Sequence, residues 1–230
     1  MLYKYLDSIR AGLESLAFDS SCIICGARES EFCIRCRADW RSSPQLISGE
    51  SFPVCSSVPY SETARAIVLS AKENGVKFTR NLVVSELCAA IRVLTRESNL
   101  VREVNLVPIP SSRKARARRG FDFISQVTNI VAKELNAESE SIRFFARPIL
   151  SNTKRVVDQS GLTELQRHEN LLGAFQVAKR LNSTAPIIII DDVITTGSTL
   201  REAVRALKER NLTASGAATA CASQRRLLIR

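Results

Sequence analysis

The sequence has little of what marks disordered or membrane-spanning chains. It contains only 9 glycines and 7 prolines in 230 residues, and 45% of its residues are hydrophobic. We therefore expect a folded chain with room for one ordinary domain and a short appendage. No apolar stretch approaches the roughly 20 residues that cross a bilayer, and the start of the chain lacks the apolar run of a signal peptide. These absences predict a soluble, cytoplasmic protein without a transmembrane segment.

Aromatic residues and glycine-rich motifs are also scarce. Aromatics make up 6% of the chain, which leaves few platforms on which bases could stack. Neither GxG nor GxxxxGK[ST] occurs, which excludes the dinucleotide-binding fingerprint and the P-loop. Positive charge, by contrast, is abundant, because the formal net charge is +10. Nucleic acid, acidic lipid and phosphorylated small molecules all fit that charge, so it selects none of them.

Four of the 7 cysteines form a cluster near the N-terminus. In a reducing cytosol, cysteines grouped in this way indicate a metal site before they indicate disulfides. Two CxxC hooks supply the thiolates: Cys22, Cys25, Cys33 and Cys36. Four cysteine ligands complete a tetrahedral Zn²⁺ site and leave no open position, so we expect one structural zinc.

Strand and helix patterns alternate through the rest of the chain. An amphipathic helix is expected at residues 2–17 and a linker at residues 41–51, followed by a series of regular elements. Helices are expected near residues 61–75, 82–95, 121–135 and 198–209, and strands near 104–109, 187–190 and 216–222. This alternation predicts an α/β fold, a parallel sheet with helices on both faces.

The most apolar of these strands is followed by an acidic pair and a hydroxyl-rich turn. Asp191 and Asp192 come directly after it, where ligands bind in such sheets. The turn offers backbone N–H groups and hydroxyls at the start of a helix whose dipole favours an anion. It consists of Thr195, Thr196, Gly197, Ser198 and Thr199. A ribose 5-phosphate would span both parts, with its hydroxyls on the acids. The alternative is a turn that only caps the helix beside a solvated acidic pair.

Residues 187–200, IIIIDDVITTGSTL, resemble the phosphoribosyl-pyrophosphate signature of type I phosphoribosyltransferases. The resemblance implies that Asp191 and Asp192 bind the ribose 2- and 3-hydroxyls and that the turn binds the 5-phosphate. It also implies that Mg²⁺ bridges pyrophosphate and ribose oxygens. The loop with Ser111, Ser112 and Arg113 resembles the part that holds pyrophosphate in these enzymes.

The same resemblance implies a mobile hood over residues 147–161. We expect Arg147 and Lys154 to act with the acidic pair in catalysis, because cations on a closing loop would stabilise the departing pyrophosphate. An ordinary exposed loop is the alternative. His168 is the only histidine, and a surface or packing role is favoured for it.

Further motifs resemble the ComF family, competence-associated proteins with a phosphoribosyltransferase domain. Arg119-Gly120-Phe121-Asp122 stands where members typically read RGFN, and Tyr60, Lys72 and Gly75 also match. The expected organisation is an amphipathic helix at residues 1–18, a four-cysteine zinc knuckle at 19–45 and a phosphoribosyltransferase-like domain at 46–230.

Two functions remain open. The first is Mg²⁺-dependent phosphoribosyl transfer from phosphoribosyl pyrophosphate to an unidentified nucleophile, in a protein that takes part in DNA uptake. The second is a non-catalytic module that binds single-stranded DNA and contacts a competence helicase or channel protein. For the second, the candidate residues form a basic loop: Lys114, Arg116, Arg118 and Arg119. A solvated surface is the alternative for that loop.

Overall fold

The structure is a computed structural model that describes residues 21–47, 50–97, 102–153 and 172–223. Two compact units divide the chain, Met1–Arg41 and Ser42–Arg230. In the first unit, α2 (Ile34–Asp39) begins within the second CxxC hook, because Cys33 is its N-cap and Cys36 lies inside the helix. The helix expected at residues 1–18 lies outside the described residues.

The second unit is built on a six-stranded sheet in the order β1-β2-β8-β7-β3-β4. The strands are β1 (Gln45–Ile47), β2 (Val54–Pro59), β3 (Arg102–Pro108), β4 (Ile142–Ala146), β7 (Ile187–Ile194) and β8 (Ala214–Ala222). All neighbouring pairs are parallel except β1 and β2, which are antiparallel. Parallel neighbours bring the carboxyl ends of β7 and β3 to one edge of the sheet.

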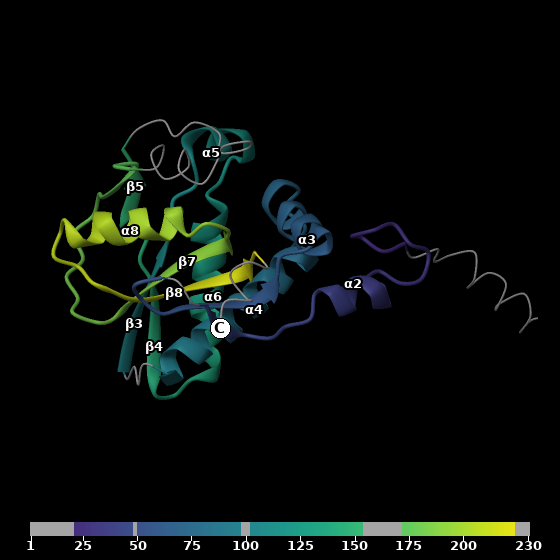
Figure 1. Cartoon of the computed structure of the whole chain (residues 1–230), viewed down its shortest axis with the longest axis horizontal. Helices are drawn as coiled ribbons and strands as arrows, with labels where there is room; N and C mark the ends of the chain where they lie inside the picture. The colour runs from purple at the N-terminus through teal and green to yellow at the C-terminus, as the bar shows by residue number, and fades with distance from the viewer. Residues whose placement is uncertain (1–20, 48–49, 98–101, 154–171, 224–230) are drawn as a thin grey trace, which may run out of the picture. The chain divides into compact units, whose positions relative to one another are not determined.

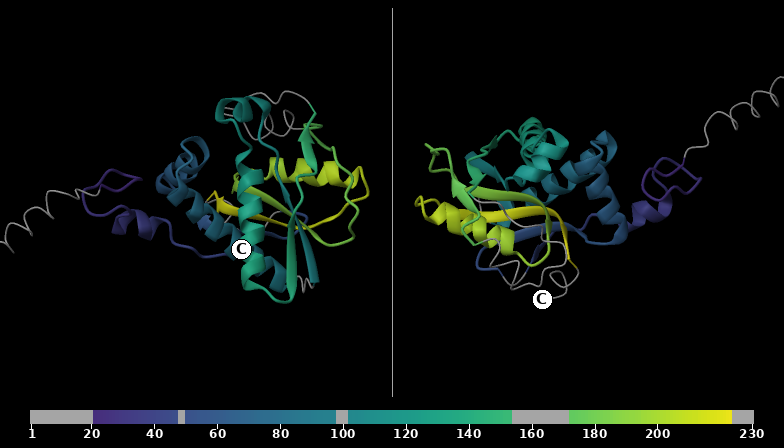
Figure 2. Two further views of the ribbon diagram at one scale, coloured as in Figure 1. Left: turned by 180° about the vertical axis from the view of Figure 1, so that it is seen from behind. Right: turned by 90° about the horizontal axis from the view of Figure 1, so that it is seen from above.

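Helices cover both faces of this sheet. One face carries α4 (Lys77–Glu97) and α6 (Phe123–Glu138), with α3 (Glu62–Glu73) packed against α4. The other face carries α8 (Ser198–Lys208), as Figure 1 and Figure 2 show. The predicted α/β fold with a parallel sheet and flanking helices is confirmed. Among the described residues, no helix combines the length and the apolar character needed to span a bilayer.

The core is centred on β7, which lies between β3 and β8. Ile188, Ile189 and Ile190 are fully buried, as expected for a strand covered on both faces. Each buried isoleucine side chain contributes about 1.5–3 kcal/mol of transfer free energy. On β8 the facing residues are mostly alanines, which allows helices to pack closely. The acidic pair lies within this buried strand, because β7 continues to Ile194 and does not end at residue 190 as expected.

A separate two-stranded ribbon lies outside the main sheet. β5 (Leu150–Asn152) pairs antiparallel with β6 (Phe175–Val177), so that Asn152 lies opposite Phe175. Residues 154–171, which connect the two strands, are outside the described part of the chain. β5 lies within the segment expected to form the hood, residues 147–161, whereas β6 lies beyond its end.

Two local expectations were wrong. The interval expected as a linker contains β1, which pairs with β2. β2 itself was not expected, because Ser56 and Ser57 interrupt its apolar pattern. Both serines are nevertheless buried, and Ser57 donates a 2.7 Å hydrogen bond to the backbone carbonyl of Glu86 in α4.

The basic loop after β3 is instead a helix, α5 (Arg113–Arg119). Its alternating alanines and arginines are good helix formers. Ser112 caps its start by accepting a 3.2 Å hydrogen bond from the amide of Ala115. Gly120, at φ 78°, ends it in the left-handed conformation that favours glycine. Its cations are therefore displayed on a helix.

Candidate functional site

A cavity of about 530 Å³ opens at the carboxyl edge of the sheet. Side chains from several separate segments of the second unit line it. They include Lys72, Ser111, Ser112, Lys114, Arg118, Arg119, Asn152, Phe175, Asp191, Asp192, Thr195 and Thr199. Nine of these twelve were expected from the sequence to contact a ligand, and the fold brings them to one place.

The acidic pair forms the polar floor of the cavity. Asp191 is 9% exposed and Asp192 is 4% exposed. The Lys72 ammonium, from α3, lies 2.5 Å from Asp192 Oδ2. The backbone amide of Asp192 donates a 2.9 Å hydrogen bond to Asp191 Oδ1. Two carboxylates and one ammonium are thus packed together away from bulk water.

This arrangement separates the protonation states of the two acids. Burial, followed by the charge of Asp192, raises the pKa of Asp191 well above its ordinary value. Burial alone would also raise the pKa of Asp192, but the Lys72 ammonium lowers it below the ordinary value. For Lys72, the two acids outweigh the effect of burial and raise its pKa. The site thus favours the charged forms of Asp192 and Lys72 and disfavours the charged form of Asp191.

The hydroxyl-rich turn leads directly into α8. Gly197 is the N-cap residue at φ 78°, and it has no side chain with which to cap the helix. The hydroxyls of Thr196 and Ser198 lie 3.0 Å apart. Thr195 and Thr199 line the cavity, whereas Ser198 lines a second pocket beside α8. The turn thus presents two of its five residues to the main cavity.

A buried carboxylate that was not expected from the sequence lies against this turn. The Glu50 side chain is 1% exposed, and its Oε1 lies 2.9 Å from Nη1 of Arg201. A Cβ added to Gly197 would come within 2.1 Å of Glu50 Oε1. Glycine at position 197 therefore satisfies two needs, the left-handed backbone and the close approach of Glu50.

The serine loop after β3 is held from two sides. Asp122, the N-cap residue of α6, accepts hydrogen bonds from the Ser111 amide at 3.2 Å and from the Ser111 hydroxyl at 3.0 Å. On the other side, Asn152 donates a 2.8 Å hydrogen bond to the Ser111 carbonyl. Asp122, at the position where the ComF pattern differs, thus has a clear role in fixing the loop.

The cations of α5 fall into two groups. Glu73 on α3 pairs with Arg118 at 2.7 Å and with Arg119 at 3.6 Å, and the Arg119 side chain is only 4% exposed. Arg113, Lys114 and Arg116 have no ion-pair partner among the described residues. Of these three, only Lys114 lines the cavity. Within the described part of the chain, the unpaired charge of α5 therefore lies toward its N-terminal end.

Of the two cations expected on the hood, the structure describes only Arg147. Arg147 does not line the cavity. Its guanidinium lies 4.9 Å from the centroid of the Phe145 ring, and its Nε donates a 3.4 Å hydrogen bond to Asn105. Lys154 and His168 lie outside the described residues.

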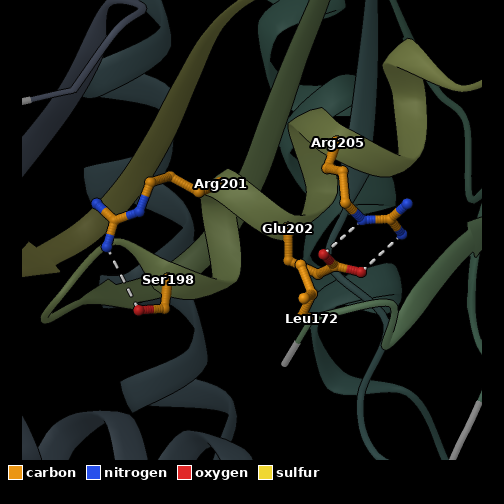
Figure 3. Close-up of a pocket in the computed structure, with 5 residues that line it drawn as sticks. All are labelled: Leu172, Ser198, Arg201, Glu202 and Arg205. Atoms are coloured by element: carbon orange, nitrogen blue, oxygen red, sulfur yellow. Dashed lines mark hydrogen bonds and ion pairs between the residues drawn. The ribbon is translucent and has the colours of Figure 1, made fainter. Parts of the chain in front are cut away.

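A second pocket lies beside α8, and Figure 3 shows Glu202 and Arg205 paired in its lining. Glu202, which is 4% exposed, accepts hydrogen bonds from Arg205 Nε at 2.7 Å and from the Phe175 amide at 3.0 Å. Burial would raise the pKa of Glu202, but the hydrogen bonds from Arg205 lower it. Because Phe175 lines the main cavity, Glu202 fixes one of its walls.

In the first unit, the four expected cysteines come together. Their sulfur atoms all lie within 4.8 Å of one another, and those of Cys25 and Cys33 are 3.6 Å apart. A tetrahedral site with zinc–sulfur bonds of about 2.3 Å needs sulfurs about 3.8 Å apart. Burial of Cys22 is outweighed by hydrogen bonds from backbone amides, which lower its pKa to about 6. The cluster could thus hold a metal ion such as zinc.

The donor set of the acidic pair suits a divalent cation less well. Asp192 Oδ2 faces the Lys72 ammonium, and Asp191 Oδ1 already accepts the Asp192 amide. A magnesium ion in direct contact with the pair would have to compete with that ammonium. The oxygens of a bound pyrophosphate, at the serine loop, would provide a better fit for the metal.

Lys72 is the site residue for which the sequence offered a usable signal. It lies four positions after Val68 and eight after Ala64, on the stripe of α3 that is otherwise buried. A lysine on an apolar stripe needs a buried counter-charge, and the nearest acids in space are Asp191 and Asp192. No comparable pattern marks Glu50.

Comparison with known proteins places these observations in a family context. A hypoxanthine phosphoribosyltransferase from Staphylococcus aureus is 16% identical, with a TM-score of 0.32, and the match covers 62% of this chain and 65% of that one. Competence protein F of Haemophilus influenzae is 28% identical over 125 residues, 54% of this chain and 52% of the relative. The chain thus spans about half the length of that relative. Residues 117–228 match the family model of the phosphoribosyl transferase domain. This chain is thus similar to a phosphoribosyl transferase domain over residues 117–228 and to competence protein F over about half of its length.

Proposed function

We propose that this protein is a cytoplasmic phosphoribosyltransferase that binds phosphoribosyl pyrophosphate and acts in DNA uptake. One observation carries the proposal: the acidic pair, the hydroxyl-rich turn and the serine loop all border a single cavity at the carboxyl edge of the sheet. These three parts match the three parts of the ligand, which are a diol, a 5-phosphate and a pyrophosphate. The role in DNA uptake rests on the similarity to competence protein F.

In this proposal each part of the site has one task. Asp191 and Asp192 accept hydrogen bonds from the ribose hydroxyls, and the turn at residues 195–199 binds the 5-phosphate through its amides and hydroxyls. Ser111, Ser112 and Arg113 bind pyrophosphate. The proposed domain that contains them spans residues 46–230, after the helix at 1–18 and the zinc knuckle at 19–45.

The chemical step is a displacement at ribose C1. The bond from C1 to the pyrophosphate oxygen breaks, and an electron pair of the acceptor forms the new bond while the acceptor loses a proton. The ionised Asp192 would stabilise positive charge that develops on the ribose, and Lys114 and Arg118 would stabilise the leaving group. Mg²⁺ bound to pyrophosphate would neutralise part of its charge. Arg147 and Lys154 would join only if the segment after β5 closes over the site.

Calorimetric titration of phosphoribosyl pyrophosphate with Mg²⁺ tests this function. Wild type should bind, and the double variant Asp191→Asn, Asp192→Asn should not. A control with the same change in charge is Glu97→Gln, Glu140→Gln, at two exposed carboxylates, which should bind as wild type does. Circular dichroism must show that both variants are folded. Absence of binding to wild type would refute the proposal.

The second candidate function is binding of single-stranded DNA by α5. It is favoured by the exposed cations Arg113, Lys114 and Arg116, which have no ion-pair partner in the described part of the chain. Each phosphate neutralised by a cation should contribute about 0.7 to the slope of log K against log salt. Lys114→Gln, Arg116→Gln should therefore lower the slope by about 1.4, as measured by fluorescence anisotropy with a labelled oligonucleotide. An unchanged slope would exclude α5 as the binding surface.

The proposed zinc site has a structural role in both functions. Four cysteine ligands leave no coordination position for a substrate, so the metal would stabilise the first unit and take no part in transfer. Competence helicase or channel proteins are the proposed partners, and neither function requires that they contact the cavity.

A further inference from the structure

A lysine lies inside the candidate site and was assigned no role by the sequence. Lys72 is in the last turn of α3, and its side chain is 27% exposed. Its ammonium borders the cavity and lies 2.5 Å from Asp192 Oδ2. Removing a lysine from water costs free energy unless a counter-charge lies close by. At this site the acidic pair supplies that counter-charge.

Among the charged groups near Lys72, the acidic pair is the one that pairs with its ammonium. The adjacent Glu73 is already paired with Arg118 and Arg119 of α5. Arg119 is the other cation that acts on Lys72, and it repels the ammonium. Two consecutive residues of α3 thus pair with the two oppositely charged parts of the site, Lys72 with the acids and Glu73 with the basic helix.

The charges around the acids balance without any added ion. Lys72 Nζ lies 2.5 Å from Asp192 Oδ2 and offsets its charge, and burial beside Asp192 raises the pKa of Asp191, which disfavours a second negative charge there. A divalent cation placed against them would add two positive charges beside the ammonium. Ribose hydroxyls are neutral, and they can donate hydrogen bonds to carboxylate oxygens without disturbing this balance.

We propose that Lys72 is a built-in counter-cation of the acidic pair, so that the ribose 5-phosphate portion of the ligand binds without a divalent metal ion. The inference rests on the proposed function, because it concerns the same site. It adds that Mg²⁺ is needed, if at all, only for binding of the pyrophosphate portion of the ligand. Ribose 5-phosphate and phosphoribosyl pyrophosphate should therefore differ in their dependence on Mg²⁺.

The test is calorimetric titration of ribose 5-phosphate into the full chain, once with EDTA and once with excess Mg²⁺. For wild type, the two dissociation constants should agree within about twofold. Lys72→Met keeps the length of the side chain and removes its charge. In EDTA it should weaken binding by on the order of tenfold or more, because the acids then lack a counter-charge, and Mg²⁺ should restore part of the loss. Lys133→Met, at an exposed position of α6, should change nothing.

Each alternative result has a distinct meaning. If wild type binds ribose 5-phosphate only with Mg²⁺, the inference is wrong and the proposed function stands. If Lys72→Met binds as wild type does in EDTA, the inference is also wrong. If wild type binds neither ribose 5-phosphate nor phosphoribosyl pyrophosphate, the proposed function itself fails. Should Lys72→Met not fold, Lys72→Arg retains the cation and should keep binding independent of Mg²⁺, while loss of that independence would overturn the inference.

Discussion

The ion pair between Glu202 and Arg205 allows a test of how burial determines the contribution of an ion pair to the free energy of unfolding. Arg205 pairs with two carboxylates. Glu202 is 4% exposed and accepts from Arg205 Nε at 2.7 Å, whereas the Glu209 side chain is 63% exposed and lies 2.5 Å from Arg205 Nη1. Replacing each glutamate in turn by alanine removes the same chemical group beside the same arginine. The two sites differ in solvent access and in the further hydrogen bond that Glu202 accepts from the Phe175 amide.

The expected costs follow from that difference. Glu202→Ala removes two charge-assisted hydrogen bonds from Arg205 and leaves the Phe175 amide without its acceptor. Removing one partner of a buried pair costs roughly 3–5 kcal/mol, and we take about 3 kcal/mol because Arg205 stays partly exposed to water. In a unit of this size that lowers the melting temperature by about 6–12 °C. Glu209→Ala should cost under about 1 kcal/mol.

The assay is urea unfolding at 25 °C, followed by far-ultraviolet circular dichroism. Both variants should keep the m-value of wild type, and only Glu202→Ala should have a clearly lower midpoint. Equal losses of stability in the two variants would refute the argument that burial sets the contribution of the pair. A loss of less than about 1 kcal/mol for Glu202→Ala would show that the ribbon is not held to α8 through this carboxylate.

Three further predictions concern the acids, the turn and the cysteines. Asp191→Asn should melt above wild type at pH 7, and the difference in melting temperature should narrow as the pH falls to 4, because folding raises the pKa of Asp191 and its ionisation therefore costs stability as the pH rises; an equal difference at both pH values would contradict this. Gly197→Ala should destabilise the protein by more than Gly120→Ala, because both glycines have φ 78° but only at position 197 would an added Cβ contact a neighbouring side chain. Gly197→Ala should also weaken ribose 5-phosphate binding by tenfold or more. Cys25→Ser should abolish a zinc content of one per chain and shift the emission of Trp40, the only tryptophan, to the red; full zinc occupancy in that variant would exclude the cluster.

The parts that the sequence predicted well are those with local signals. The strand at residues 187–190 has four consecutive isoleucines, and the turn after it has the glycine and hydroxyl chemistry of an anion site. These features depend on neighbours in the chain, so they can be recognised without the fold. Two CxxC hooks form a local signal of the same kind.

The parts that were missed depend on distant partners. β2 has two buried serines, which are acceptable because Ser57 finds an acceptor on α4. The buried Glu50 side chain pairs with Arg201, which lies far along the chain. α5 was expected to be a loop because its charge pattern outweighed the helix propensity of its alanines and arginines. In each case the local structure is determined by a tertiary contact, and such a contact produces no periodic pattern in the sequence.

The strand order has a consequence for how the chain is made. β2 (residues 54–59) pairs in parallel with β8 (residues 214–222), and β3 pairs in parallel with β7. Both of these parallel pairings can form only after much later parts of the chain have been synthesised. During synthesis the first half of the sheet therefore leaves the ribosome with its inner edges unpaired. Parallel pairings over such long sequence separations form slowly, and exposed strand edges invite association with other chains. The edge of the sheet that contains the acidic pair can form only after β8 has been synthesised. This edge is therefore among the last parts of the nascent protein to fold. We expect folding of the protein to depend on chaperones that shield the unpaired strand edges.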